Sequence, residues 1–351
     1  MKRMSLTAHP HVRKSGTYFG YAYAYNEIKT NFEKYLAELG IKLELNTPKA
    51  NVQMYFGSPH GFFYPHQYKI QMTQWESTKV PPHWKDHAKE YDEWWTANEF
   101  GRQAFINSGV PEEKLHVFEH GVDSGLWTPK LRGQNDVIRF LHIDSGSPRK
   151  RADIAKEAFK KAFGNNLDYE ITFKHSHIPS TGVNWDNPEV MAEHGDWEDG
   201  NIRHIRENMD IKDLVKLYQH HDVIIYPSEG EGFGLIPMQA LSTGMPVIST
   251  GRWCSYERYL NGNIIDSHLG QSQIQETYTR FGDVVVPSLD SAVELMRSVA
   301  ADIQGQSEIF FNQRQQVVQD YDWYALSKKA IDSLISRVGI NIFDSSKGYL
   351  K

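Results

Sequence analysis

The sequence has little cysteine, no long apolar run and no excess of positive charge. Cys254 is the only cysteine in 351 residues, which excludes an intrachain disulfide framework and fits a reducing compartment. No stretch is long and apolar enough to cross a bilayer, and the charged N-terminal segment lacks the apolar region of a signal peptide. We therefore expect a cytoplasmic protein with no stable membrane insertion.

The overall charge argues against a protein whose main task is to coat nucleic acid. The formal net charge is -6, whereas such proteins are basic. A local cluster of Lys2, Arg3, Arg13 and Lys14 could contact an anionic acceptor or a membrane surface, but we favour a solvated terminus. No His or carboxylate spacing indicates a metal site, and we expect no metal and no cofactor.

Strand and helix patterns alternate along the chain. This alternation predicts an α/β protein with parallel sheets, and the length suits two domains. The apolar spacing predicts helices at residues 26–39, 99–107, 154–162, 211–218, 289–299 and 309–335, and strands at 41–45, 52–56, 68–72, 115–118, 137–143, 169–174, 201–205, 223–226, 247–248 and 283–286.

Residues 226–249 predict a strand, a glycine turn and a helix. Gly232 and Gly234 let the backbone approach a ligand, and the free N–H groups at the helix start favour an anion. Glu231 would repel that anion unless the ligand also carries hydroxyl groups for the carboxylate to accept. A nucleotide sugar has both parts.

A second turn, after the 137–143 strand, carries the cations Arg149, Lys150 and Arg151. Three cations at a helix start oppose the helix dipole, so a bound anion is the natural compensation. Both turns follow strands, and α/β sheets bind ligands at the carboxyl edge of their strands. Lys174, at the end of another strand, could approach the same anion or lie at the surface.

Three strings near this turn form an ordered pattern: Glu231-Gly-Phe-Gly-Leu, Gln239-Ala-Leu and Gly244-Met-Pro-Val-Ile. They resemble the donor-site signature of the retaining glycosyltransferases of family four (glycosyl transferases group 1). The resemblance implies the GT-B fold, with two Rossmann-like domains facing a central cleft. We expect an acceptor-side domain at residues 1–130, a nucleotide-sugar domain at 131–320 and a helical tail at 321–351 that returns toward the first domain.

The resemblance also implies roles for single residues on the donor side. Glu231 would contact the donor sugar, and Lys150 with Arg149 would neutralise the diphosphate. The family's second glutamate, which binds the ribose, is Gln239 here, and its arginine position holds Ser145. The full donor-binding set that we expect is Gly232, Phe233, Gly234, Leu235, Gln239, Ser145, Lys174 and Arg206, the last selecting the base.

On the acceptor side, the candidates follow the 68–72 strand and precede the interdomain connection. The family commonly has a histidine near the first point, where this chain has Gln74 or Trp75. Glu76 is the candidate for accepting the acceptor's proton, and a plain surface carboxylate is the alternative. His120 and Gly121 would face the bound sugar. Aromatic residues around residues 58–65 could stack on sugar rings or on bases.

The resemblance implies a retaining, metal-independent glycosyltransferase with a nucleotide-diphosphate sugar as donor. A glycan or a lipid-linked saccharide is the expected acceptor, and the aromatic N-terminal half leaves a modified nucleobase in DNA as a minority possibility. Residues 176–200 form a candidate lid. The alternative is a non-catalytic nucleotide-sugar-binding protein on a degenerate GT-B scaffold, motivated by Gln239 and Ser145.

Overall fold

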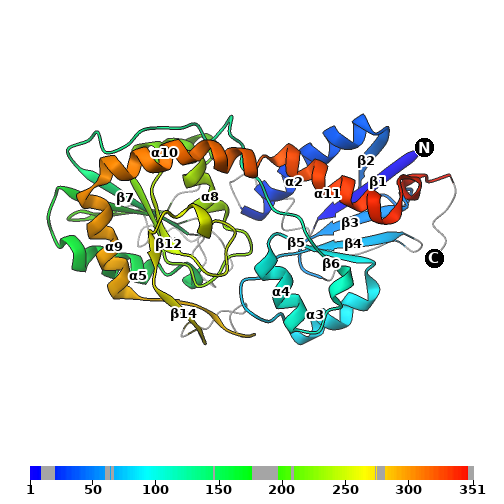
Figure 1. Ribbon diagram of the computed structural model, residues 1–351, viewed down its shortest axis with the longest axis horizontal. Coiled ribbons are helices and arrows are strands. Elements are labelled where there is room, and N and C mark those ends of the chain that lie inside the picture. Colours follow the sequence, from blue (N-terminus) through cyan, green and yellow to red (C-terminus); the bar gives the residue numbers. More distant parts are fainter. Residues whose placement is uncertain are drawn as a thin grey trace. The chain divides into compact units, whose positions relative to one another are not determined.

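The computed structural model describes residues 1–8, 20–59, 64, 67–144, 147–175, 197–206, 209–272, 274 and 281–346. The chain divides into two compact units (Figure 1). Unit 1 comprises Met1–Gly121 and Tyr321–Lys351, and unit 2 comprises Val122–Asp320. The chain therefore leaves unit 1 after Gly121 and returns to it at Tyr321.

Unit 1 is built on a six-stranded parallel sheet with the order β2-β1-β3-β4-β5-β6. Its strands are β1 (Lys2–Ala8), β2 (Ile41–Leu45), β3 (Val52–Phe56), β4 (Tyr68–Met72), β5 (Glu93–Thr96) and β6 (Leu115–Val117). Its helices are α2 (Gly20–Glu38), α3 (Pro82–His87), α4 (Glu99–Asn107) and α11 (Trp323–Val338). Helices α2 and α11 lie side by side, and α4 packs on β5 and β6 (Figure 1).

The N-terminal segment is a central strand, so our expectation of a solvated terminus was wrong for residues 2–8. β1 lies between β2 and β3 in the sheet. Met4 and Leu6 are fully buried, and the polar Ser5 and Thr7 are buried as well. Buried parallel strands normally show near-continuous apolar runs, and here the flanking cations and alternating hydroxyls hide that signal.

Unit 2 contains a seven-stranded sheet with the order β13-β12-β11-β7-β8-β10-β9, parallel except for β9. Its strands are β7 (Ile138–Asp144), β8 (Tyr169–His175), β9 (Trp197–Asp199), β10 (Ile202–Ile205), β11 (Val223–Tyr226), β12 (Val247–Thr250) and β13 (Ile264–Ile265), with β14 (Ser267–Gly270) and β15 (Val284–Pro287) pairing separately. Its helices are α5 (Ala152–Phe163), α7 (Ile211–His220), α8 (Leu235–Ser242), α9 (Leu289–Ala301) and α10 (Ile303–Asp320).

The core of unit 2 lies between the sheet and helices α5 and α9. Phe140 and Ile171 of the central strands pack there against Phe159 of α5 and Met296 of α9. The opposite face of the sheet supports α8, which contacts β11, β12 and α10. This arrangement places the turns after β7 and β11 at neighbouring strand ends, because β7 and β11 are adjacent and parallel.

The predicted strands and helices are confirmed apart from their boundaries and a few omissions. The sequence pattern missed β1, β5, β13, β14 and α3, and β9 lies within the segment predicted as a lid loop. The rest of that segment, residues 176–196, lies outside the described residues, as does most of the aromatic 58–65 segment. None of the helices in the described ranges is long and apolar enough to span a membrane.

Candidate active site

The turn between β11 and α8, residues 227–234, is held in place by glycine geometry. Gly234 begins α8 with a φ of 95°, in the region that favours glycine. A Cβ built on Gly234 would lie 2.3 Å from Cε1 of Tyr256. Pro237 falls in the first turn of α8, where no intrahelical N–H is needed. Gly234 is therefore required both for its backbone conformation and for the close packing of Tyr256.

The loop between β7 and α5 carries the three cations that the sequence singled out. Pro148–Lys150 form one 3₁₀ turn, and Arg151 follows with a φ of 55° and a ψ of 48°. A left-handed conformation is strained for a residue with a side chain. It turns the chain at the start of α5, so that Arg149 and Lys150 reach Glu231 of the 227–234 turn while Arg151 reaches Glu229 of the same turn and Asp153 of α5.

Arg149 and Lys150 meet at Glu231. The Nζ atom of Lys150 lies 2.5 Å from Oε1 of Glu231, and Nη1 of Arg149 lies 3.3 Å from the same oxygen. The Ser228 hydroxyl donates to that oxygen at 2.6 Å, and Nη1 of Arg149 also donates to the Gly230 carbonyl. Residues about 80 positions apart in the sequence thus form one buried cluster.

The electrostatics of this cluster keep Glu231 ionised. Burial raises the pKa of its carboxyl, but the charges of Lys150 and Arg149 outweigh burial and hold that pKa below the ordinary 4.5. One carboxylate faces two cations, so the cluster retains one positive charge. An excess positive charge in a buried site attracts an anion strongly, because little solvent screens it. The cluster can therefore still attract and bind an anion such as a phosphate group.

Arg151 belongs to a separate network that the sequence did not reveal. Its Nη1 donates to Oε1 of Glu229 at 2.9 Å, and its Nε and Nη2 donate to Asp153 at 2.9 and 2.8 Å. Glu229 is 1% exposed and accepts a second bond from the Ser272 hydroxyl. Its amide donates to the Arg149 carbonyl at 3.0 Å. The bond between Glu229 and Arg151 therefore joins the β7–α5 loop to the β11–α8 turn. Arg149 and Lys150 pair with Glu231 instead.

The structure describes most of the other predicted donor residues and gives contacts for some of them. Gln239 is fully buried, and its Oε1 accepts from the Tyr218 hydroxyl at 3.4 Å. Lys174, at the end of β8, is 2% exposed and donates to the His175 carbonyl at 2.8 Å. Phe233 is buried, Arg206 follows β10, and Ser145 lies outside the described residues. Their roles in donor binding stay predictions.

A chain of hydrogen bonds at the same strand ends was also missed by the sequence. His175 Nδ1 lies 3.0 Å from Asp144, His175 Nε2 lies 3.2 Å from His204 Nδ1, and Lys156 Nζ lies 3.4 Å from His204 Nε2. Burial raises the pKa of Asp144, but its contacts with His142 and His175 outweigh burial and hold it well below the usual range. The three strand-end residues are far apart in sequence, so no local spacing could have indicated them.

In unit 1, the structure places the acceptor-side candidates in well-packed positions. Trp75 is 1% exposed, its Nε1 donates to Ser77 and Lys79, and its ring packs against Trp84. His120 is fully buried, lies 3.0 Å from Nε2 of Gln74, and burial lowers its pKa to about 3.

Gly121 and Glu76 complete the acceptor-side set. A Cβ on Gly121 would lie 2.7 Å from both the ring and the backbone N of Trp323, so the close chain crossing alone explains this glycine. Glu76 is 9% exposed, which argues against a plain surface carboxylate. Whether these residues contact an acceptor stays a prediction. In the portions of both units that are described, no group of three or more His, Cys, Asp or Glu is arranged to hold a metal ion.

Comparison with solved structures identifies the architecture. The structure of HepE from Anabaena in complex with UDP-glucose superposes with a TM-score of 0.66, covering 96% of this chain and 100% of that chain at 13% identity. Sucrose-phosphate synthase from Thermosynechococcus elongatus gives a TM-score of 0.66, with 96% and 99% coverage at 12% identity. The chain has the GT-B fold.

The sequence match to glycosyltransferases lies in unit 2. Residues 198–274 match the family model described as Glycosyl transferases group 1. A D-inositol 3-phosphate glycosyltransferase from Paenarthrobacter aurescens (strain TC1) is 23% identical over 164 residues, which cover 40% of this chain and 36% of that protein. The match thus spans little more than a third of the curated relative. The family segment contains Glu231 and α8, whereas Arg149 and Lys150 precede it.

Proposed function

We propose that this protein is a retaining glycosyltransferase that takes a sugar from a nucleotide-diphosphate donor. The observation that carries the proposal is the buried cluster of Arg149, Lys150 and Glu231 at the start of α8. Its excess positive charge suits a diphosphate, and the carboxylate suits sugar hydroxyls. The UDP-glucose complex of HepE supports testing UDP-sugars first.

In the proposed reaction, the bond between the anomeric carbon and the diphosphate breaks, and a bond to an acceptor hydroxyl oxygen forms on the same face. The acceptor proton passes to the departing phosphate oxygen. Negative charge grows on the diphosphate as the bond breaks, so Arg149, Lys150 and the N–H groups of the α8 start stabilise the transition state more than the ground state. Glu231 orients the sugar through its hydroxyls.

We infer that the reaction needs no metal ion. Charge neutralisation of the leaving diphosphate falls to Arg149 and Lys150, which are 8% and 7% exposed and therefore act in a medium that screens them little. The acceptor that fits this proposal is the hydroxyl of a glycan or a lipid-linked saccharide. Glu76 of unit 1 remains the candidate acceptor-side carboxylate.

A donor panel tests the proposal. Purified protein is incubated with UDP-, GDP-, ADP- and dTDP-sugars, with and without EDTA, and the release of nucleoside diphosphate is followed. We expect release from one donor, unchanged by EDTA and reduced about 10²- to 10³-fold in Lys150→Met. Lys160→Met, an exposed lysine of α5, is the matched control. Tight donor binding without any release, also in the presence of candidate acceptors, would instead favour a non-catalytic scaffold.

A further inference from the structure

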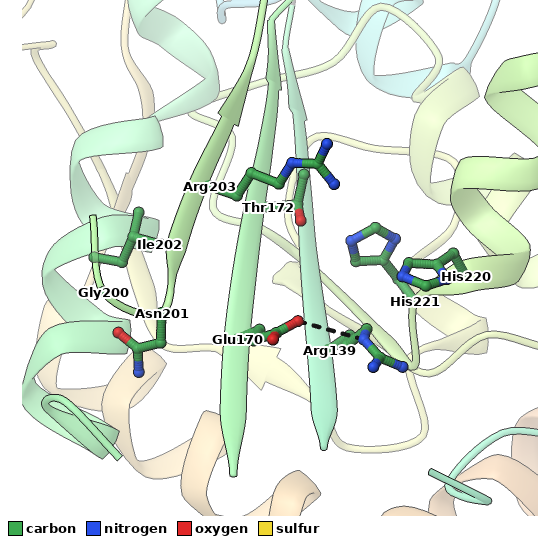
Figure 2. Close-up of a pocket in the computed structure, with 9 residues that line it drawn as sticks. All are labelled: Arg139, Glu170, Thr172, Gly200, Asn201, Ile202, Arg203, His220 and His221. Atoms are coloured by element: carbon green, nitrogen blue, oxygen red, sulfur yellow. Dashed lines mark hydrogen bonds and ion pairs between the residues drawn. The ribbon is translucent and has the colours of Figure 1, made fainter. Parts of the chain in front are cut away.

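A cavity of about 90 Å³ lies at the amino-terminal ends of β7, β8 and β10 (Figure 2). Arg139, Glu170 and Arg203 are the second residues of these three strands. The cluster at Glu231 follows the opposite, carboxyl ends, and Arg139 precedes the last residue of β7 by five positions, about 17 Å along the strand. The cavity is therefore separate from the candidate active site.

The charged and hydroxyl side chains that line the cavity come from the face of the sheet opposite the α5–α9 core, whereas Ile202 belongs to that core. Side chains alternate along a strand, and Phe140 and Ile171 point into that core. Arg139 and Thr172 consequently point to the other face, and Arg203 lies beside Thr172 in register. The end of α7 covers this face, so that His220 and His221 close the cavity (Figure 2).

The strands supply hydrogen-bond donors that have few partners. Within the described residues, the Arg203 guanidinium makes no hydrogen bond or ion pair, and neither does the hydroxyl of Thr172, a residue only 6% exposed. Arg139 uses its Nε toward Glu170 at 3.3 Å, which leaves further N–H groups of the guanidinium. The Thr172 hydroxyl is not among the enclosed polar atoms that lack a partner, so solvent reaches it, and a ligand in the cavity would replace that solvent.

His221 supplies an acceptor of fixed orientation. Its Nδ1 lies 2.7 Å from the Leu217 carbonyl, which can only accept, so Nδ1 carries the proton. Burial, with smaller contributions from Arg139 and Arg203, lowers the pKa of His221 to about 3. The neutral ring therefore presents the lone pair of Nε2. Figure 2 shows this imidazole on the α7 side, facing Thr172 and Arg203.

Charge around the cavity is positive although a helix ends there. The C-terminal carbonyls of a helix favour cations, but here they are already occupied: Lys130 donates to the Gln219 carbonyl, and Arg132 Nε donates to the His221 carbonyl at 3.1 Å. The nearby carboxylates are Glu170 and Asp222, and Asp222 accepts from the amides of Gly133 and Arg139. The cavity lining itself holds the two cations Arg139 and Arg203 and the one carboxylate Glu170, and Glu198 of β9 lies opposite Arg203 in register.

We propose that this cavity binds a protonated phosphate group, as inorganic hydrogen phosphate or as the monoanion of a phosphate monoester, which is the minority form of a monoester at neutral pH. Arg203, Arg139 and Thr172 donate to its oxygens, and its own O–H donates to Nε2 of His221. A volume of about 90 Å³ holds roughly three waters, which is the room that one phosphate group needs. Sulfate has no proton to donate at neutral pH, so it cannot satisfy His221.

Calorimetric titration with inorganic phosphate at neutral pH and constant ionic strength tests the proposal. Because the cluster at Glu231 could also bind phosphate, the stoichiometry is read in Lys150→Met, where we expect one phosphate per chain. Adding Arg203→Gln to that variant should weaken binding about tenfold, and adding Thr172→Val should weaken it less. Adding Arg297→Gln, at an exposed arginine of α9, is the matched control and should change nothing. Binding that persists in Lys150→Met separates this cavity from the cluster at Glu231.

Two further titrations, with sulfate and with glycerol 3-phosphate, identify the ligand. Sulfate should bind more weakly than phosphate, because the His221 acceptor stays unsatisfied. Glycerol 3-phosphate binding more tightly than inorganic phosphate would identify a monoester as the natural source, and the reverse order would identify free phosphate. The proposal is overturned if the wild type does not bind phosphate at millimolar concentration, if sulfate binds equally well, or if binding is lost in Lys150→Met but kept in Arg203→Gln.

Discussion

Unit 2 gathers Arg149, Lys150 and Glu231 from two distant segments, whereas unit 1 ties its candidate residues Trp75 and Gly121 into packing contacts. In unit 2, like and unlike charges are buried side by side, an arrangement that carries a large desolvation cost and is often found at functional sites. In unit 1, a buried indole and a crowded glycine are sufficiently explained by the fold. This difference indicates that charged side chains brought together from distant segments identify the candidate site better than burial or residue type does.

Glycine substitutions should give the largest difference between the two units, in both stability and nucleotide binding. Gly234→Ala combines a positive φ with a Cβ 2.3 Å from Tyr256, so we expect a loss of about 3 kcal/mol or more in unfolding free energy and no nucleotide release. Gly121→Ala should cost about 1–3 kcal/mol through its clash with Trp323 and leave nucleoside diphosphate binding intact.

Denaturant unfolding and calorimetry measure these two quantities. Gly262→Ala is the control, because Gly262 has a φ of 86° but nothing lies within 4 Å of its built Cβ, so only about 1 kcal/mol of backbone strain is expected. Loss of nucleotide binding in Gly121→Ala at a temperature where it is folded would contradict a purely structural role for that glycine.

An ion pair of unit 1 between the buried Glu93 and the partly exposed Arg337 provides the next test. Arg337 of α11 donates from Nε and Nη2 to both oxygens of Glu93, each at 2.8 Å, and Glu93 also accepts from Trp95. Arg337→Met would leave a buried carboxylate without its cation, which should destabilise the protein by about 3 kcal/mol. Thermal unfolding measures the loss, and turnover per folded molecule should not change. A parallel loss of turnover would show that this pair serves more than the fold of unit 1.

Each unit also contains a buried neutral histidine that makes stability depend on pH. Burial lowers the pKa of His120 and of His221 from 6.5 to about 3. Between pH 6.5 and about 4, the unfolded chain binds protons that the folded chain does not, so stability is complete above pH 6.5 and falls on acidification. The slope is up to about 1.4 kcal/mol per pH unit for each histidine.

Urea midpoints measured across this pH range test the prediction. His120→Gln should flatten the acid slope of unit 1, whatever its effect on absolute stability at neutral pH. An unchanged slope would mean that His120 is more accessible to protons than its burial indicates.

The smallest expected effect concerns Trp75. Trp75→Phe keeps most of the ring contact with Trp84 but removes the Nε1–H bonds to Ser77 and Lys79, which should cost about 1 kcal/mol of stability. Steady-state kinetics should give an unchanged KM for the acceptor. A raised KM with normal stability would restore Trp75 as an acceptor contact.

Much of the fold could be predicted from periodicity, and the exceptions have physical reasons. Strands such as β11 show apolar runs bounded by glycine turns, whereas β1 carries Lys2 and Arg3 at its start and hides its buried Met4 and Leu6. Long-range parallel pairing, which buries β1, leaves no mark in the local sequence.

The candidate site was predictable in its charged residues but not in their pairing. Lys150 stood out as a cation beside a helix start, and Glu231 as a carboxylate beside an expected anion site. Arg149 and Lys150 pair with Glu231 whereas Arg151 pairs with Glu229, and this division depends on the left-handed backbone of Arg151. An arginine in the sequence does not indicate that conformation. Likewise, the contact of His175 with Asp144 arises from strand register, which no local pattern specifies.

The central claim is that Lys150 holds the diphosphate while Glu231 acts on the sugar. Titrating the nucleoside diphosphate of the active donor into wild type, Lys150→Met and Glu231→Gln tests this division most directly. We predict about tenfold or greater weakening in Lys150→Met, and equal or tighter binding in Glu231→Gln, which removes a negative charge beside the phosphates but loses turnover. Unchanged binding in Lys150→Met, or equal weakening in both variants, would contradict the account.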